Sequence, residues 1–219
     1  MPRTSDASRP TCLLIPGRDH PRRNDWQSAW IRERDDCIGV DLDSLRDPIR
    51  SVWLNRIDQA VGMARAPVVL VAHDVGCLAV AWWAALLGKR AARRVTGALL
   101  VAPPDTDAPG RDDRVRRFGP LPEAMLPFPA ILVASRDDPN ATIERSRAMA
   151  AEWVTDFFDA GSLGHLDARS HLNAWPDGQR LLDILIDGGP GLSRYTYRRP
   201  PPPRPASRPA HRMTPSSQP

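Results

Sequence analysis

Cysteine is scarce in this sequence. The 219 residues contain three cysteines, Cys12, Cys37 and Cys77, which are far apart in the chain and include no C-x-x-C spacing. An odd number of widely spaced cysteines excludes a closed disulfide framework of the kind that holds small secreted domains together. We therefore expect reduced thiols and a cytoplasmic location.

Long hydrophobic runs are also missing. No stretch approaches the roughly 18 consecutive apolar residues of a membrane-spanning helix, and the first 17 residues, MPRTSDASRPTCLLIPG, lack the layout of a signal peptide. The sequence thus predicts a soluble protein with no membrane contact. Its 42% hydrophobic residues and seven tryptophans are typical of a globular domain.

Net positive charge is absent from most of the chain. The protein has a formal net charge of +4, but residues 190–219 hold six arginines and no acidic residue, so removing those six charges leaves residues 1–189 at −2. Phosphate recognition requires clustered basic residues, and we therefore expect no nucleic-acid binding by the folded part. The Arg/Pro-rich segment 189–219 is predicted to be disordered. It could contact a protein partner, or it could be only a solvated extension.

Short apolar runs alternate with amphipathic stretches along residues 11–188, which we predict to form one domain after a flexible segment 1–10. Alternation of this kind indicates an α/β fold with a mostly parallel sheet and helices on both faces. The predicted strands are 11–16, 37–42, 67–73, 97–102, 129–135 and 153–160, and the predicted helices are 25–34, 48–64, 76–87, 141–152 and 177–186. Residues 103–128 form a long Pro- and charge-rich connection, predicted to be either a lid or a mobile surface loop.

The stretch VVLVAHDVGCLAV, residues 68–80, predicts a strand that turns sharply into a helix. In one large enzyme architecture this turn presents a nucleophile, usually serine, but here the position holds Asp74. Ligands bind beyond the carboxyl ends of strands in open parallel sheets. We therefore expect Asp74 to project into a solvent-reachable hollow that it shares with His165. The order Asp74, Asp138, His165 matches the nucleophile–acid–histidine order of α/β-hydrolases.

Several further motifs occur in a characteristic order: LLIPG (13–17), DWQSAW (25–30), PVVLVAHDVGCLAVAWWA (67–84), GALLVAPPD (97–105), LPFPAILVASRDDP (126–139) and DAGSLGHLDARSHLNAWPDG (159–178). Together they resemble the family of small serine hydrolases that includes retinoblastoma-binding protein 9. The resemblance implies an α/β-hydrolase fold without a large cap domain. It also implies that His165 is the catalytic base, that Asp138 orients it, and that backbone N–H groups of Arg18 and Val75 form an oxyanion hole.

The sequence departs from the family pattern around the expected pocket. The family's serine is replaced by Asp74, its histidine before Trp-Gln by Asp25, and its Gly-His-Ile-Asn by a sequence containing Asp167. Its Ser-Gly-Leu-Gly becomes Ser-His-Leu-Asn, which contains His171. This clustering predicts a repurposed or abandoned site. The pocket candidates are Asp25, Trp26, Asp105, Asp167 and His171.

A carboxylate nucleophile suits attack on an sp³ carbon that carries a halide or an epoxide oxygen, because the product is an ester that water can hydrolyse. Asp74 resembles the nucleophile of haloalkane dehalogenases and epoxide hydrolases. Between two carboxylates His165 should favour the imidazolium form, and esterification of Asp74 should lower its pKa so that it can act as a base. Alternatively, Asp74 and His165 activate water for slow ester hydrolysis, or the chain is an inactive scaffold that binds a small molecule or a protein.

The groups that would assist a leaving group are not evident in the sequence. The residue after Asp74 is Val75 where haloalkane dehalogenases carry tryptophan, and the two tyrosines, Tyr195 and Tyr197, lie in the predicted tail. An indole N–H could instead donate a hydrogen bond to the leaving group, and the candidates, which are otherwise core residues, are Trp26, Trp30 and Trp175. Cys77, one turn into the helix, is predicted to be a core residue. The spacing of His165, Asp167 and His171 fits no metal signature, so we predict neither a metal nor a cofactor.

Overall fold

The structure, a computed structural model, describes residues 9–19 and 21–187. The predicted tail 189–219 and most of the predicted flexible segment 1–10 lie outside the described residues. A six-stranded sheet in the order β2-β1-β3-β4-β5-β6 forms the centre of the molecule. All five strand pairings are parallel, which confirms the predicted fold class.

Each predicted strand is present, although the bounds differ at the ends. The strands are β1 (Thr11–Ile15), β2 (Cys37–Gly39), β3 (Val68–His73), β4 (Val95–Val101), β5 (Ala130–Ala134) and β6 (Asp156–Asp159). The run 37–42 gives a strand of three residues because β2 pairs with β1 alone, through three residues. β4 begins two residues before its predicted start, since Val95 pairs with Val68 across a register shift.

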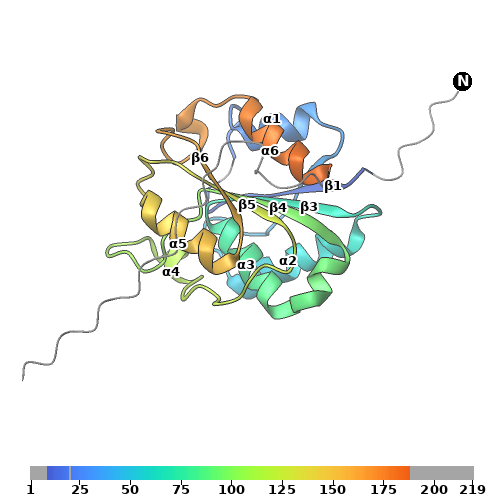
Figure 1. Ribbon diagram of the computed structural model, residues 1–219, viewed down its shortest axis with the longest axis horizontal. Helices are drawn as coiled ribbons and strands as arrows, with labels where there is room; N and C mark the ends of the chain where they lie inside the picture. The colour runs from blue at the N-terminus through green and yellow to red at the C-terminus, as the bar shows by residue number, and fades with distance from the viewer. Residues whose placement is uncertain (1–8, 20, 188–219) are drawn as a thin grey trace, which may run out of the picture.

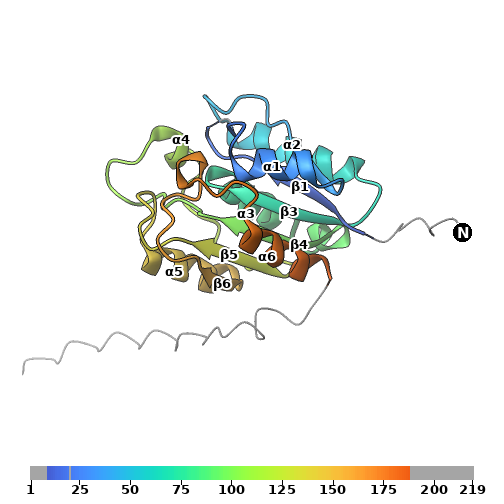
Figure 2. The ribbon, with the colours of Figure 1, turned by 90° about the horizontal axis from the view of Figure 1, so that it is seen from above.

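Helices cover both faces of this sheet (Figure 1). α1 (Trp26–Glu33) and α6 (Pro176–Ile186) lie on one face, in front of the strands in Figure 2. α2 (Arg50–Met63), α3 (Val75–Leu87) and α5 (Ile143–Trp153) lie on the other. The 3₁₀ segments Gly88–Arg93 and Ala168–Ser170 were not predicted.

Alternating side chains of the strands divide the core into two layers. In β1, Leu13 and Ile15 pack into the cluster beneath α2 and α3, whereas Cys12 and Leu14 pack toward α1 and α6. This is the period-2 alternation of a strand buried on both faces. Val75–Arg93 has the length and mean hydropathy of a membrane span, but 56% of that window is buried within the molecule. We interpret α3 as the central core helix.

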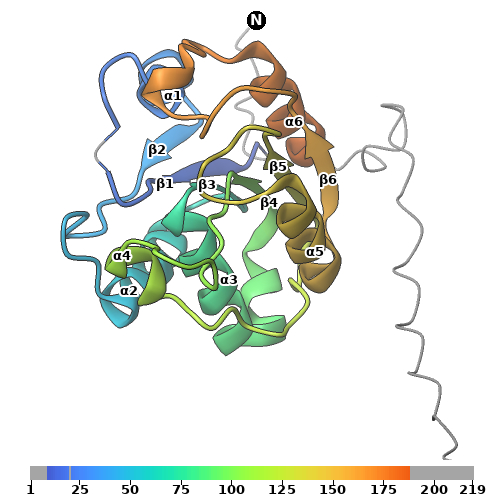
Figure 3. The ribbon, with the colours of Figure 1, turned by 90° about the vertical axis from the view of Figure 1, so that its left-hand side faces the viewer.

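The long connection 103–128 is packed against the body of the protein. It contains a one-turn helix, α4 (Asp113–Arg116), which is labelled in Figure 3, and the side chains of Val115 and Phe118 in this connection are fully buried in the core. Trp82 of α3 donates a hydrogen bond from its indole to the carbonyl of Phe118 at 2.7 Å. These contacts correct the alternative that the segment is a mobile surface loop.

The strand order brings two loops together at the carboxyl edge of the sheet. The chain runs from β1 outward to β2 and then returns to β3 on the other side of β1. In open α/β sheets this change of direction opens a crevice between the two strand ends, where ligands bind. Gly17 and Arg18 follow β1, and Asp74 follows β3, so the topology places all three at this crevice.

Candidate active site

Asp74 occupies a tight turn between β3 and α3. Its backbone has φ 51° and ψ −128°, a region in which non-glycine residues are strained and which is found mainly at functional sites. The Asp74 N–H donates to the carbonyl of Val101 at 3.0 Å, and the Asp74 carbonyl accepts from Cys77 N–H at 3.0 Å. The turn is therefore held by the neighbouring strand and by the first turn of the helix.

Two glycines allow the chain to pass close to this turn. A Cβ atom on Gly76 would lie 2.5 Å from the carbonyl oxygen of Pro16, and one on Gly17 would lie 2.6 Å from Cβ of Asp74. Real Cβ contacts are longer than this, so neither position accepts a side chain without displacing backbone or Asp74. The loop after β1 and the start of α3 thus need glycine in order to enclose the carboxylate.

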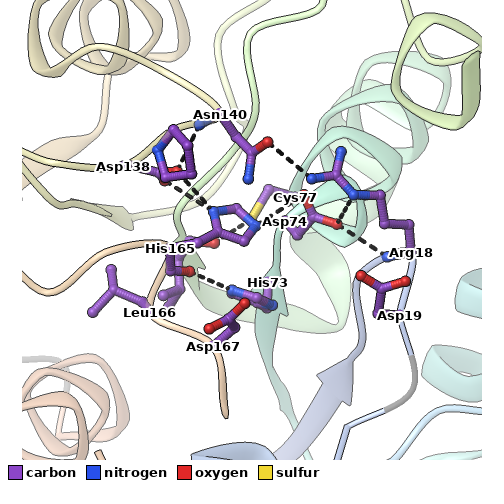
Figure 4. A network of polar contacts seen from close by, with 12 residues as sticks. Arg18, Asp19, His73, Asp74, Cys77, Asp138, Asn140, His165, Leu166 and Asp167 are labelled. Atoms are coloured by element: carbon purple, nitrogen blue, oxygen red, sulfur yellow. Dashed lines mark hydrogen bonds and ion pairs between the residues drawn. The ribbon is translucent and has the colours of Figure 1, made fainter. Parts of the chain in front are cut away.

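The three residues predicted from their order in the chain are in contact (Figure 4). Nε2 of His165 lies 3.2 Å from Oδ1 of Asp74, and Nδ1 of His165 lies 3.0 Å from both carboxylate oxygens of Asp138. All three side chains are at most 5% exposed. The imidazole therefore bridges two buried carboxyl groups, one on each ring nitrogen.

His165 lies on the loop after β6, which is fixed from two sides. His73 donates from Nε2 to the carbonyl of His165 at 3.0 Å, and the indole of Trp26 donates to the carbonyl of Leu166 at 2.8 Å. Gly164, with φ +60°, donates its N–H to Asp137 at 2.8 Å. The backbone around His165 is thereby tied to β3, to α1 and to the loop after β5.

Sequence reasoning missed the role of the Arg18 side chain. Nε of Arg18 lies 3.6 Å from Oδ2 of Asp74, and Nη2 donates to Oδ1 of Asn140 at 3.0 Å. Asn140 in turn donates its N–H to Asp138 at 2.8 Å, so the two residues close a ring of polar contacts around the site (Figure 4). The position of Arg18 directly after a strand was the available signal, whereas nothing in the sequence singled out Asn140.

The charges in this cluster determine the protonation states of Asp74 and His165. Burial would raise the pKa of Asp74, but the hydrogen bond from His165 and the charges of His165 and Arg18 outweigh it and lower that pKa. Burial would lower the pKa of His165, but its bonds to Asp138 and Asp74 raise that pKa to about 9. At neutral pH the resting site therefore holds an Asp74 carboxylate and a His165 imidazolium.

One of the two predicted oxyanion donors binds the Asp74 carboxylate itself. The backbone N–H of Arg18 donates to Oδ2 of Asp74 at 3.0 Å. Val75 stands in the first turn of α3, where a backbone N–H has no intrahelical acceptor. The carboxylate thus takes one of the two predicted donors, which in a serine enzyme would face a substrate oxygen.

Asp74 does not project into the solvent-reachable hollow that the sequence predicts. Asp74 and His165 are 3% and 6% exposed, because the Arg18 loop covers the carboxylate. A cavity of about 200 Å³ lies beside α1 and β2, lined mostly by apolar side chains including Leu14, Ile31 and Leu45, and its lining contains neither Asp74 nor His165. A substrate reaches the carboxylate only if Arg18 moves.

Three pocket candidates have structural roles instead. Asp25 caps α1 by accepting from the N–H of Gln27 at 3.0 Å, and Asp105 pairs with Arg145 at 3.1 Å. Trp26 is 1% exposed, and its N–H is committed to Leu166, as the N–H of Trp30 is to the carbonyl of Ala174. Neither indole is free to assist a leaving group.

The last two pocket candidates, Asp167 and His171, differ in how close they lie to the site. Asp167 caps the 3₁₀ segment 168–170 and pairs with Arg169, and it lies near His73 in Figure 4. His171 is exposed and has left-handed backbone, with φ 51°. The structure therefore brings Asp167 close to the site and leaves His171 at the surface.

The cysteines behave as core residues. Cys77 is fully buried, with Sγ 3.3 Å from the carbonyls of Ala72 and Val101, as predicted. Cys12 and Cys37 stand opposite each other on β1 and β2, and with Asp36 they bring three metal-ligating atoms within 4.8 Å. Both oxygens of Asp36 are already bound by Arg34 at 3.0 Å, so this cluster lacks a free carboxylate.

A family model described as serine hydrolase matches residues 12–184, more than three quarters of the sequence. The chain belongs to the serine hydrolase family. This family assignment agrees with the α/β fold and makes the chain a hydrolase of that fold. A search of curated protein sequences gives no match.

Solved structures extend the comparison of this serine hydrolase family member. A YdeN-like hydrolase from Pectobacterium atrosepticum is 25% identical with a TM-score of 0.69, over 81% of this chain and 93% of its own. Est1E from Butyrivibrio proteoclasticus is 14% identical, with a TM-score of 0.59 over 82% and 89% of the two chains. The RedJ thioesterase of Streptomyces coelicolor is 16% identical, with a TM-score of 0.54 over 85% and 96%. The last two show likeness of fold alone.

Proposed function

We propose that this chain hydrolyses a small molecule through a covalent ester on Asp74, formed by displacement at an sp³ carbon. The observation that carries the proposal is the contact chain from Asp74 through His165 to Asp138, with an ionised carboxylate at the elbow. Within the family, we also infer from the motifs quoted above that the chain belongs with the group that includes retinoblastoma-binding protein 9.

The protonation of His165 favours displacement over direct activation of water. A base must be unprotonated to take a proton from water. With a pKa of about 9 for His165, only about 1% of the imidazole is neutral at pH 7. Displacement needs an ionised Asp74 at the start, and it needs a neutral His165 only after the ester has formed.

In the first step, a carboxylate oxygen of Asp74 attacks the carbon and the leaving group departs with the bonding electron pair. For a halide, Asp74–COO⁻ and R–X give Asp74–COO–R and X⁻. Each carboxylate oxygen offers about two lone-pair positions, so Oδ1 and Oδ2 retain acceptor capacity while His165 and Arg18 N–H donate to them. These two donors hold the nucleophile in one orientation.

In the second step, the ester is hydrolysed. Asp74 then carries no charge, and because that charge helps to raise the pKa of His165, the imidazole loses its proton to solvent more readily. Neutral His165 takes a proton from water while the water oxygen attacks the ester carbonyl. The bond to the alcohol oxygen then breaks, and that oxygen takes the proton from His165. The Asp74 carboxylic acid gives its proton to His165, which restores the carboxylate and the imidazolium, so the net reaction is R–X + H₂O giving R–OH, X⁻ and H⁺.

A trapping experiment tests this proposal. His165→Gln should form the ester but hydrolyse it slowly, so incubation with haloacids, haloalkanes and epoxides should add the mass of the alkyl group to the peptide that contains Asp74. Wild type should release halide or diol, and Asp74→Asn should do neither. If no compound in the panel gives product or adduct, the displacement mechanism is wrong.

A second candidate, an inactive scaffold, is favoured by the burial of the carboxylate. Asp74 is 3% exposed and is bonded to both His165 and Arg18, which would also suit an ion pair that only stabilises the fold. The two candidates differ in one measurable respect. A scaffold gives no adduct in His165→Gln with any electrophile, whereas a displacement enzyme gives one on Asp74.

A further inference from the structure

The guanidinium of Arg18 has hydrogen-bonding capacity that the protein does not use. Its side chain is only 12% exposed, yet among the described residues it donates a single hydrogen bond, from Nη2 to Asn140. Its contact with Asp74 is an ion pair at 3.6 Å, which is longer than a hydrogen bond. Since a guanidinium carries five N–H donors, most of them have no hydrogen-bond acceptor among the described residues.

We propose that Arg18 binds the anionic group of the substrate, and that the substrate is therefore a small carboxylate with its leaving group on the adjacent carbon. This inference rests on the proposed function and specifies its substrate class. A planar guanidinium fork matches a carboxylate bidentately. Arg18 thus retains enough unused donors to bind such a group.

Charge compensation gives the physical reason for an anionic substrate. Asp74 must lose the Arg18 guanidinium before a carbon atom can approach it, because the Arg18 loop covers the carboxylate. A neutral substrate would leave the Arg18 guanidinium, which is only 12% exposed, without its contact to the Asp74 carboxylate, which is unfavourable for a nearly buried charge. A substrate carboxylate replaces Asp74 as the partner of Arg18, and the Asp74 charge remains stabilised by His165 and by the Arg18 N–H.

Distances support the same conclusion. Nε of Arg18 and Oδ2 of Asp74 are 3.6 Å apart, so an anion held by the guanidinium lies next to the nucleophile. The carbon attached to that carboxylate is then the nearest electrophilic position. Because Asp74 is only 3% exposed, its surroundings favour a small substrate.

Neighbouring residues keep Arg18 in place during this exchange. Asn140 holds Nη2, and Arg114 of α4 donates to the backbone carbonyl of Arg18 at 3.1 Å and to Asp19 at 3.2 Å. These contacts hold the backbone and one end of the guanidinium, while the guanidinium pivots from Asp74 toward the incoming anion. With 2-chloroacetate, the step would form the Asp74 ester of glycolate and release chloride, and hydrolysis would give glycolate.

Binding of acetate tests the anion site without any turnover. Sodium acetate is titrated into wild type at constant ionic strength, and the imidazole signals of His165 are followed by NMR. We expect a saturable shift in wild type that disappears in Arg18→Met. Arg18→Lys keeps the charge but loses the fork and should bind acetate more weakly, while the exposed Arg32→Met, on α1, should match wild type. Absence of a saturable shift in wild type, or its persistence in folded Arg18→Met, overturns the anion site.

Turnover tests the substrate class with a matched pair of compounds. 2-Chloroacetate and 2-chloroacetamide have nearly the same shape and differ in charge. We expect kcat/KM for chloride release to be at least about 100-fold higher for the anion, and Arg18→Met to remove this preference, since truncating one partner of a buried charge pair costs a factor of this order. Equal rates in wild type refute the anion preference but leave the displacement mechanism standing, whereas acetate binding without an adduct from any electrophile refutes the mechanism alone.

Discussion

The strongest prediction concerns stability as a function of pH. The ordinary pKa of a histidine is 6.5, and that of folded His165 is about 9. Because its side chain is 5% exposed, solvent screens its interactions little. The interval between 6.5 and 9 is worth about 3 kcal/mol of unfolding free energy, at about 1.36 kcal/mol per pH unit.

The sign follows from proton binding. Between pH 6.5 and 9 the folded protein binds the His165 proton and the unfolded chain releases it, so the free energy of unfolding falls as pH rises. The contribution of His165 is complete below pH 6.5 and is lost as pH passes through 9. A depressed carboxylate such as Asp74 acts in the opposite sense, since its contribution is lost at acid pH.

Urea unfolding at several pH values from 6 to 10 measures this effect. The quantity of interest is the difference between wild type and His165→Gln, because groups common to both proteins cancel. That difference should shrink by about 3 kcal/mol across the range, and NMR titration of His165 in wild type should have its midpoint near 9. A midpoint at or below 6.5, or a difference that does not depend on pH, would refute the ion-paired site.

Two further predictions concern the turn at Asp74. Gly17→Ala should lower the free energy of unfolding by about 1–3 kcal/mol, because its Cβ would lie 2.6 Å from Cβ of Asp74. The control Gly62→Ala, with nothing within 4 Å of the added Cβ, should raise that free energy by up to about 1 kcal/mol. Equal effects of the two substitutions in urea unfolding would contradict this account. Asp74→Ser should react with a serine-directed phosphonate, since His165 is within reach of that position, whereas Asp74→Ala should not. Mass spectrometry of the labelled peptide measures the reaction. A folded but unreactive serine variant would show that His165 does not activate a hydroxyl there.

Much of the fold could be predicted from the sequence because both layers of the core depend on local pattern. The apolar run 67–73 predicted a buried strand, and Val68–His73 is buried throughout; the glycine after Asp74–Val75 marked the turn into α3. The order of Asp74, Asp138 and His165 in the chain was also sufficient to predict that the three side chains lie together, since the strand ends of a parallel sheet meet at one edge.

The remainder depended on contacts that no local pattern encodes. Asp25 departs from the family pattern, and it and the neighbouring Trp26 were assigned to a pocket, but capping of α1 and the bond to Leu166 commit their polar atoms. Burial of the Asp74 carboxylate depends on where the Arg18 side chain lies, and that position is set by Asn140, 122 residues away. The sequence could place Arg18 after a strand, but only the packed loops show that its guanidinium covers the nucleophile.

The two outermost strands have a consequence for self-association. β2 and β6 have three and four residues, fewer than any of the inner strands, and β6 begins and ends with an aspartate. Two short borders, one of them with charged ends, give another polypeptide few backbone groups to pair with. We therefore expect the protein to resist growth of its sheet from one molecule into the next, even at high concentration.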